Sequence, residues 1–190
     1  MPPSIEGDAS PLPQAYCLLG TLAGVIGKDQ TVTARADTYS KDLDGVFAEI
    51  SGTIAQVGDD QWTAIAPEDG RQINVVLDHI VNTQLLMPQL ISGLANDGTL
   101  PPVTGEDIEH GNQHHMSEAA QVARADVLAK LDQAQAAYRA LLPTLTDDQL
   151  DRAAFFGPFG GDVTPEVLIQ VIMICHAQDH LGSVKSAIAG

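Results

Sequence analysis

The sequence predicts an all-α fold, an antiparallel four-helix bundle preceded by an N-terminal extension. Apolar residues recur at spacings of three and four over four long stretches, which is the pattern of amphipathic helices. Glycine and proline clusters separate these stretches, and no segment shows the strict alternation of a half-buried strand. At 190 residues, 44% of them hydrophobic, the chain is long enough to bury the core of one domain.

The first half of the chain predicts an arm and two helices. Residues 1–34 contain several prolines and are expected to form an arm or short helix, and the bundle itself is expected over 35–190. Helical spacing of apolar residues extends over 39–57, and a second such stretch covers about 72–94. Pro88 is expected to kink the second helix or end its regular part, because proline removes an interior hydrogen bond.

The second half predicts two more helices. A third stretch of helical spacing runs over about 117–142 and is stopped by Pro143. A capping-box pattern at 146–149 predicts a short helical turn. Thr164 and the proline that follows it then supply the start of a last helix, which is expected to end near Ile188.

The composition excludes two classes of partner. The chain has 25 acidic and 9 basic residues, so it lacks a basic stripe for the phosphates of nucleic acid or the headgroups of an anionic membrane. Cys17 and Cys175 do not form a disulfide framework, so we expect a reducing, cytoplasmic location. The longest apolar run, 16–26, is too short to span a bilayer and no lysine or arginine precedes it, so we expect neither an export nor an anchoring signal.

The last predicted helix carries two histidines that can share one ligand. His176 and His180 are four residues apart, so their imidazoles project from the same helix face. This face is otherwise apolar and should point into the bundle, where an imidazole without a partner costs about 1–3 kcal/mol. His79 lies in an apolar part of the second helix and can come opposite the pair, as in metal sites built from facing bundle helices. The alternative is that each is a core histidine satisfied by ordinary hydrogen bonds.

A rival group of histidines occurs in the segment EHGNQHH. His110 and His114 are also four residues apart, and His115 follows. Their neighbours are polar and turn-forming, so a solvated helix start or loop is favoured over a metal site. Cys175 points about 100° away from His176 on a helix, and we expect it to pack as a small hydrophobic residue rather than act as a nucleophile.

In order and spacing, these features resemble the DinB/YfiT-like metalloenzyme superfamily, which includes thiol-dependent transferases and mycothiol-dependent maleylpyruvate isomerases. The resemblance covers roughly 35–190 and rests on the segments NVVLDHIVN, SEAAQVARADVLAKLDQAQAAYRALL, LTDDQLD and HAQDHLGSVKSAI. It implies a bundle of DinB-like type and assigns the three metal-binding histidines of the family to His79, His176 and His180. Three neutral imidazoles suit zinc, nickel or iron, and they leave positions open for water or substrate.

The resemblance also implies a function, that of a low-molecular-weight-thiol S-transferase or a thiol-dependent isomerase acting on a small molecule. A thiol cosubstrate would bind at the open position, lose its proton and attack an electrophile. The same site could activate water for hydrolysis, and no residue in the sequence indicates whether the nucleophile is a thiol or water. The alternative from another class is a non-enzymatic metal- or ligand-binding stress-response protein.

Two polar residues are candidates for orienting the imidazoles. Asn82 lies one turn beyond His79, and Asp179 is next to His180. The alternative is that both side chains are simply solvated. The face of the last helix that points away from the histidines is also apolar, which predicts either a homodimer interface or packing against the first helix or the arm.

The loop FFGPFGG leads directly into the helix that carries two of the histidines. Its side chains Phe155, Phe156 and Phe159 are candidates for the substrate pocket, because an aromatic loop with three glycines can both line an apolar pocket and move. The alternative is that these aromatic residues cap the end of the bundle core.

Overall fold

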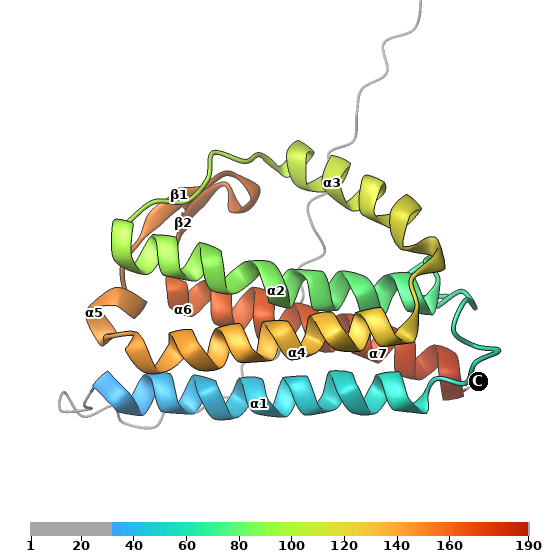
Figure 1. The fold of residues 1–190 in the computed structure, drawn as a ribbon. Helices are drawn as coiled ribbons and strands as arrows, with labels where there is room; N and C mark the ends of the chain where they lie inside the picture. Colours follow the sequence, from blue (N-terminus) through green and yellow to red (C-terminus); the bar gives the residue numbers. More distant parts are fainter. Residues whose placement is uncertain (1–31, 190) are drawn as a thin grey trace, which may run out of the picture.

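The structure is a computed structural model that describes residues 32–189, and it confirms the four-helix bundle (Figure 1). The last of the four long helices is continuous but consists of three segments. The four are α1 (Val32–Gln56), α2 (Ile73–Asp97), α4 (Arg124–Leu141) and the helix formed by α6 (Pro165–Val167), η4 (Leu168–Cys175) and α7 (His176–Ala189). Helix α1 thus begins inside the range predicted as an arm, and the rest of that arm lies outside the described residues.

The chain does not reverse direction at every long helix. Helices α2 and α4 run in the same direction and lie side by side, because α3 (Gly105–Glu118) carries the chain back along the bundle between them (Figure 1). Apolar side chains from all four long helices fill the space between the helices. Buried members include Leu43, Ile50, Leu77, Ile80, Leu131, Tyr138, Ile169 and Leu181.

Helix α2 continues through Pro88, so this residue does not end the helix, which was one of the two predicted outcomes. The helix runs on to Asp97, and Gly98 then ends it in the left-handed conformation with φ of 68°. Beyond the proline, Ile91 and Leu94 remain in the core. The packing of this apolar face outweighs the one hydrogen bond that proline removes.

The expected third helix, predicted from about residue 117, begins only at Arg124, and a separate helix lies before it. This helix is α3, which begins at a capping box between Thr104 and Asp107 and contains no buried residue. A single 3₁₀ turn, η1 (Ala119–Gln121), follows and buries Ala119, and α4 then begins at Arg124. The side chain of Asn74 donates hydrogen bonds to the carbonyls of residues 119 and 120, which explains why the chain turns there.

Between α4 and the last helix the chain forms a 3₁₀ turn, η2 (Leu142–Thr144), a short helix and a hairpin. Helix α5 (Asp147–Leu150) has the predicted capping box. The expected loop is instead a hairpin of β1 (Ala154–Phe156) and β2 (Gly161–Val163), which pair antiparallel. The turn η3 (Gly157–Phe159) joins them, and Gly160 adopts a φ of 64° that favours glycine.

The last helix starts as predicted but contains a segment that no periodicity indicates. The side chain of Thr164 accepts a hydrogen bond from the amide of Val167, which caps the start. Segment η4 is a π-helix, in which the amide of His176 bonds to the carbonyl five residues earlier. By length and composition Pro165–Ala189 could cross a membrane, but this is weak evidence because the helix packs as one side of the bundle.

Candidate metal centre

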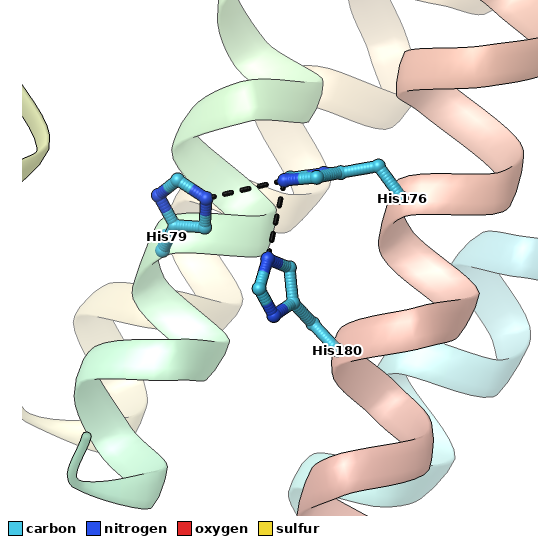
Figure 2. Close-up of side chains that lie close together, drawn as sticks. All are labelled: His79, His176 and His180. Atoms are coloured by element: carbon cyan, nitrogen blue, oxygen red, sulfur yellow. Dashed lines mark hydrogen bonds between the residues drawn. The ribbon is translucent and has the colours of Figure 1, made fainter. Parts of the chain in front are cut away.

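Three imidazoles converge between α2 and α7 (Figure 2). Nε2 of His176 lies 3.3 Å from Nε2 of His79 and 3.2 Å from Nε2 of His180. One ligand atom from each ring can be chosen so that all three lie within 4.8 Å of one another. The structure therefore brings together the three histidines that the sequence singled out.

The packing of α2 against the last helix sets this arrangement. His79 lies on α2 between the buried residues Asp78 and Ile80, and α7 begins at His176 directly after the π-helical segment. The buried side chain of Gln84 on α2 donates a hydrogen bond of 2.8 Å to the carbonyl of Met173 in that segment. This contact fixes the two helices in register one turn away from the histidines.

The environment keeps two of the rings uncharged at neutral pH. Burial is the main cause that lowers the pKa of His79 to about 3 and that of His176 to about 4. The neighbouring imidazoles and the positive charge of Arg71 contribute to these lowered values. Neutral imidazole is the form that binds a metal ion, so both rings are ready to act as ligands.

A buried carboxylate orients the third ring. Oδ2 of Asp69 lies 2.6 Å from Nδ1 of His180, and the Asp69 side chain is 4% exposed. Burial opposes the charge of Asp69, but hydrogen bonds from His180 and Arg71 hold the pKa of this carboxyl well below its ordinary value. An ionised Asp69 accepts the proton on Nδ1, so the lone pair of His180 is on Nε2 and faces the other two histidines.

The spacing and chemistry of these nitrogens fit a divalent transition metal. A tetrahedral ion with metal–nitrogen bonds of about 2.0–2.1 Å holds its ligand nitrogens about 3.3–3.4 Å apart. Without a cation, neutral rings facing one another through Nε2 have too few protons to satisfy every contact. Nδ1 of His176 is also buried with no hydrogen-bond partner among the described residues. Moving the ring proton from Nε2 to Nδ1 would therefore leave that proton without an acceptor.

The two polar residues predicted to orient the imidazoles lie elsewhere. Asn82 donates a hydrogen bond of 2.9 Å to Asp78, and its amide nitrogen is 2.8 Å from Nε2 of His115. Asp179 is exposed, and the carboxylate on His180 is Asp69. The side chain in contact with the ring thus comes from a loop distant in sequence.

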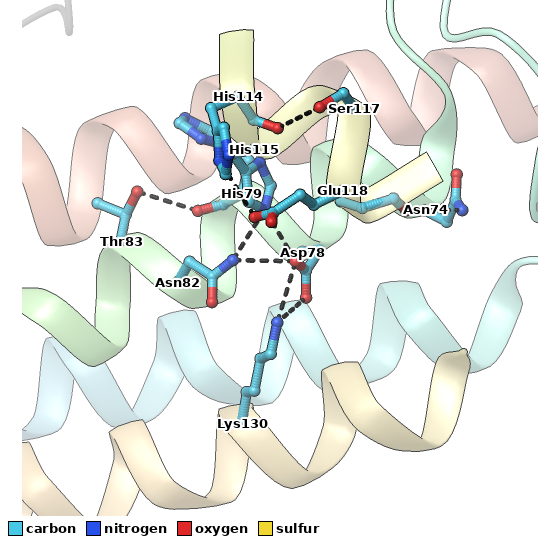
Figure 3. Close-up of polar contacts among 11 residues, drawn as sticks. Asn74, Asp78, His79, Asn82, Thr83, His114, His115, Ser117, Glu118 and Lys130 are labelled. Atoms are coloured by element: carbon cyan, nitrogen blue, oxygen red, sulfur yellow. Dashed lines mark hydrogen bonds and ion pairs between the residues drawn. The ribbon is translucent and has the colours of Figure 1, made fainter. Parts of the chain in front are cut away.

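Beside the triad, Asp78 is the centre of a polar network that links three helices (Figure 3). Its carboxylate lies 2.8 Å from Nζ of Lys130 on α4 and 2.8 Å from Nε2 of His115 on α3. The ring centroid of His115 is 6.0 Å from that of His79. The network therefore holds the end of α3 next to the three histidines.

The other two histidines of the EHGNQHH segment lie in solvent. His110 and His114 are exposed, and the side chain of His114 makes an exposed ion pair of 3.2 Å with Glu118. His115 was grouped with them from the sequence, but it is the histidine of this segment that takes part in the Asp78 network. Its side chain is 20% exposed and reaches Asp78.

The phenylalanine loop packs against the start of α3 rather than against the histidines. Gly157 lies so close to the carbonyl of Val103 that a Cβ there would come within 2.2 Å of that oxygen. Phe156 is buried at 6% exposure and its ring lies 5.9 Å from that of Phe159, whereas Phe155 and Phe159 are exposed. No contact joins these three side chains to the histidine triad, and their part in a substrate pocket stays a prediction.

The fold and the site together define a class, helical-bundle proteins whose inward histidines from facing helices can hold one metal ion with coordination positions left open. The chain belongs to the DinB superfamily, whose sequence model matches residues 42–184. No curated protein matches it. The fold is similar to that of YfiT from Bacillus subtilis, described as a probable metal-dependent hydrolase with an unusual four-helix bundle topology. The TM-score is 0.68 at 16% identity over 85% of this chain and 90% of that one.

Proposed function

We propose that this protein is a metal-dependent enzyme that joins a low-molecular-weight thiol to a small electrophile, as an S-transferase or a thiol-dependent isomerase. The observation that carries the proposal is the convergence of three Nε2 atoms, two of them on rings with depressed pKa values. Three protein ligands leave coordination positions open, which is typical of catalytic rather than structural sites. Membership of the DinB superfamily supports the proposal.

When bound, a divalent zinc, nickel or iron ion would lower the pKa of a thiol or water in an open position and so supply the nucleophile. The residues of the chain hold and orient the site. His79, His176 and His180 supply neutral donors, so they leave the charge of the ion undiminished. Asp69 fixes the tautomer of His180, and the network around Asp78 fixes α3 beside the site.

Hydrolysis is a second candidate function. It is favoured by the structural similarity to YfiT, which is described as a probable metal-dependent hydrolase. The three-histidine site is compatible with a thiol or a water as the nucleophile. The identity of the nucleophile is therefore the quantity to measure.

The test combines metal analysis with a reaction screen. The purified protein is expected to contain about one transition-metal ion per chain and to consume a low-molecular-weight thiol in the presence of an electrophile. Release of an acid from an ester without thiol consumption would favour the hydrolase. Stoichiometric metal or ligand binding without turnover of either kind would favour a non-enzymatic binding protein of the stress-response type.

We also propose a homodimer in the cytoplasm. The support is the outward face of the last helix, where Val171 is 42% exposed and Ile174 is half-buried beside α1. Light scattering at micromolar concentration is expected to give twice the mass of one chain. The mass of a single chain would overturn the dimer without affecting the metal site.

A further inference from the structure

Arg71 is a part-buried cation at the edge of the three-histidine site. It immediately precedes Gln72, the N-cap of α2, and its side chain is 17% exposed. Its Nε is bonded to Asp69, and its Nη2 lies 3.4 Å from Nδ1 of His180. Its charge also reaches the other two ligands, since it contributes to the lowered pKa values of His79 and His176.

Most of the donors of this guanidinium lack an acceptor. A guanidinium has five N–H donors, and Asp69 takes the one on Nε. Nδ1 of His180 is no acceptor, because it carries a proton and donates a hydrogen bond of 2.6 Å to Asp69. Among residues 32–189 no oxygen accepts a hydrogen bond from either Nη atom of Arg71, so its terminal fork is unused by the protein.

The other arginines of the described chain differ in this respect. Each directs at least one Nη atom to a carboxylate or carbonyl oxygen, as expected for a part-buried guanidinium. They are Arg35 on Asp151, Arg124 on the carbonyl of Ile54, Arg139 on Asp44 and Arg152 on the carbonyl of Asn96. The free fork is thus a particular feature of the arginine beside the triad.

The charge balance of the site favours an anionic ligand. Asp69 and Arg71 neutralise each other, and Asp78 and Lys130 do the same on the other side of the site. The three histidines are neutral ligands, so a divalent ion would keep its full charge. A planar oxyanion is the group that fits both a guanidinium fork and a nearby positive centre.

We propose that Arg71 binds a carboxylate, or an oxyanion of the same shape, on the small molecule that enters the three-histidine site. The inference rests on the proposed function and adds the class of ligand to it. Arg71 is then a specificity-determining residue, which selects anionic thiols or electrophiles over neutral ones of equal size.

The experiment uses the full chain loaded with Co²⁺, whose visible absorption reports thiol coordination. The probes are 3-mercaptopropionate and 1-propanethiol, which have the same carbon chain and differ in the carboxylate. We expect the parent protein to bind 3-mercaptopropionate about tenfold or more tightly than 1-propanethiol, the effect of a charge-assisted hydrogen bond. Arg71→Gln should abolish this preference while cobalt content and the affinity for 1-propanethiol stay unchanged.

Two further variants separate recognition from structure. Arg152→Gln removes the same charge near the C-terminal end of α2, away from the triad, and should keep the preference. Arg71→Lys keeps a cation for Asp69 but lacks the fork, so it should retain cobalt and lose part of the preference.

Three results would overturn the inference. One is equal affinity of the parent for the two probes, and another is an unchanged preference in Arg71→Gln. The third is an equal loss of cobalt or of affinity for both probes in Arg71→Gln and Arg71→Lys, which would show that Arg71 only supports Asp69. A parent protein that binds no cobalt would overturn the proposed function as well, so the two failures are distinguishable.

Discussion

Asp69 and His180 are joined by a contact of 2.6 Å between Oδ2 and Nδ1, on the side of the ring opposite the nitrogen that faces His176. The pair links the loop before α2 to α7, so the part of the chain that precedes one ligand helix orients a ligand on the other. A carboxylate in this position fixes the tautomer of an imidazole and increases its basicity as a ligand.

We therefore expect Asp69→Asn to weaken metal binding by about 10–100-fold, the range found for residues that support a ligand through a hydrogen bond. Competition with a chelator measures the affinity. Asp179→Asn is the matched control, because it alters an exposed carboxylate next to His180 in sequence. Equal affinities in parent and Asp69→Asn would show that the contact does not support the site.

Replacing a ligand should remove the metal altogether. His176 lies between the other two imidazoles, so His176→Ala is expected to reduce the metal content from about one ion per chain to near zero in elemental analysis. The double variant His110→Ala/His114→Ala should keep the full content, because both side chains are exposed. Loss of metal in the double variant would place the site on α3 instead.

The metal-free protein should lose stability in acid through its buried histidines. In the unfolded chain these rings have an ordinary pKa of 6.5, whereas in the fold His79 titrates at about 3 and His176 at about 4. Between these values the unfolded state binds more protons, so the free energy of unfolding falls as the pH decreases from about 6.5 to about 4. Above 6.5 neither state binds these protons and the contribution is constant.

Denaturant unfolding of the metal-free protein at several pH values measures this effect. The variant His79→Phe lacks one of the titrating groups, so its stability should decline less steeply over the same range. Parallel pH profiles for parent and variant would contradict the depressed pKa.

The network at Asp78 should contribute to stability rather than to metal binding. Its side chain is 3% exposed and its partners are partly exposed, so Asp78→Asn leaves Lys130 and His115 able to reach water. We expect a loss of about 1–3 kcal/mol in the free energy of unfolding. His115→Ala should loosen α3, which buries no residue of its own, and speed amide hydrogen exchange there.

The control for this prediction is His114→Ala, which removes the exposed neighbour on the same helix. It should change neither the free energy of unfolding nor the exchange of α3. If His115→Ala and His114→Ala behave alike, the network does not hold α3.

Replacing the phenylalanines of the hairpin tests whether these side chains serve packing or substrate binding. Phe156→Ala is expected to cost about 3 kcal/mol of stability, because the side chain is 6% exposed, and Phe159→Ala about 1 kcal/mol or less. Both variants should keep their metal. A change in substrate affinity or turnover in the folded Phe159→Ala variant would support a pocket role, and unchanged kinetics would limit the hairpin to packing.

Local sequence signals were sufficient to predict most of the helices. The capping box at Thr146, the N-cap at Thr164 and the apolar periodicity of α1 and α2 each act over a few neighbouring residues, so the sequence shows them directly. Pro88 does not end α2, because burial of the residues beyond it outweighs one hydrogen bond. The start of α4 at Arg124 rather than near residue 117 was missed because the turn before it depends on Asn74, which is distant in sequence.

By itself the sequence determined the four apolar helices and the spacing that puts His176 and His180 on one face, because helical periodicity is a property of the chain alone. Only the tertiary structure decided which other groups meet there. Asp69 reaches His180 from a loop, and His115 reaches Asp78 from a helix with no buried residue. Such contacts join residues far apart in the chain, and they form only where packing of the apolar faces has already fixed the positions of the helices.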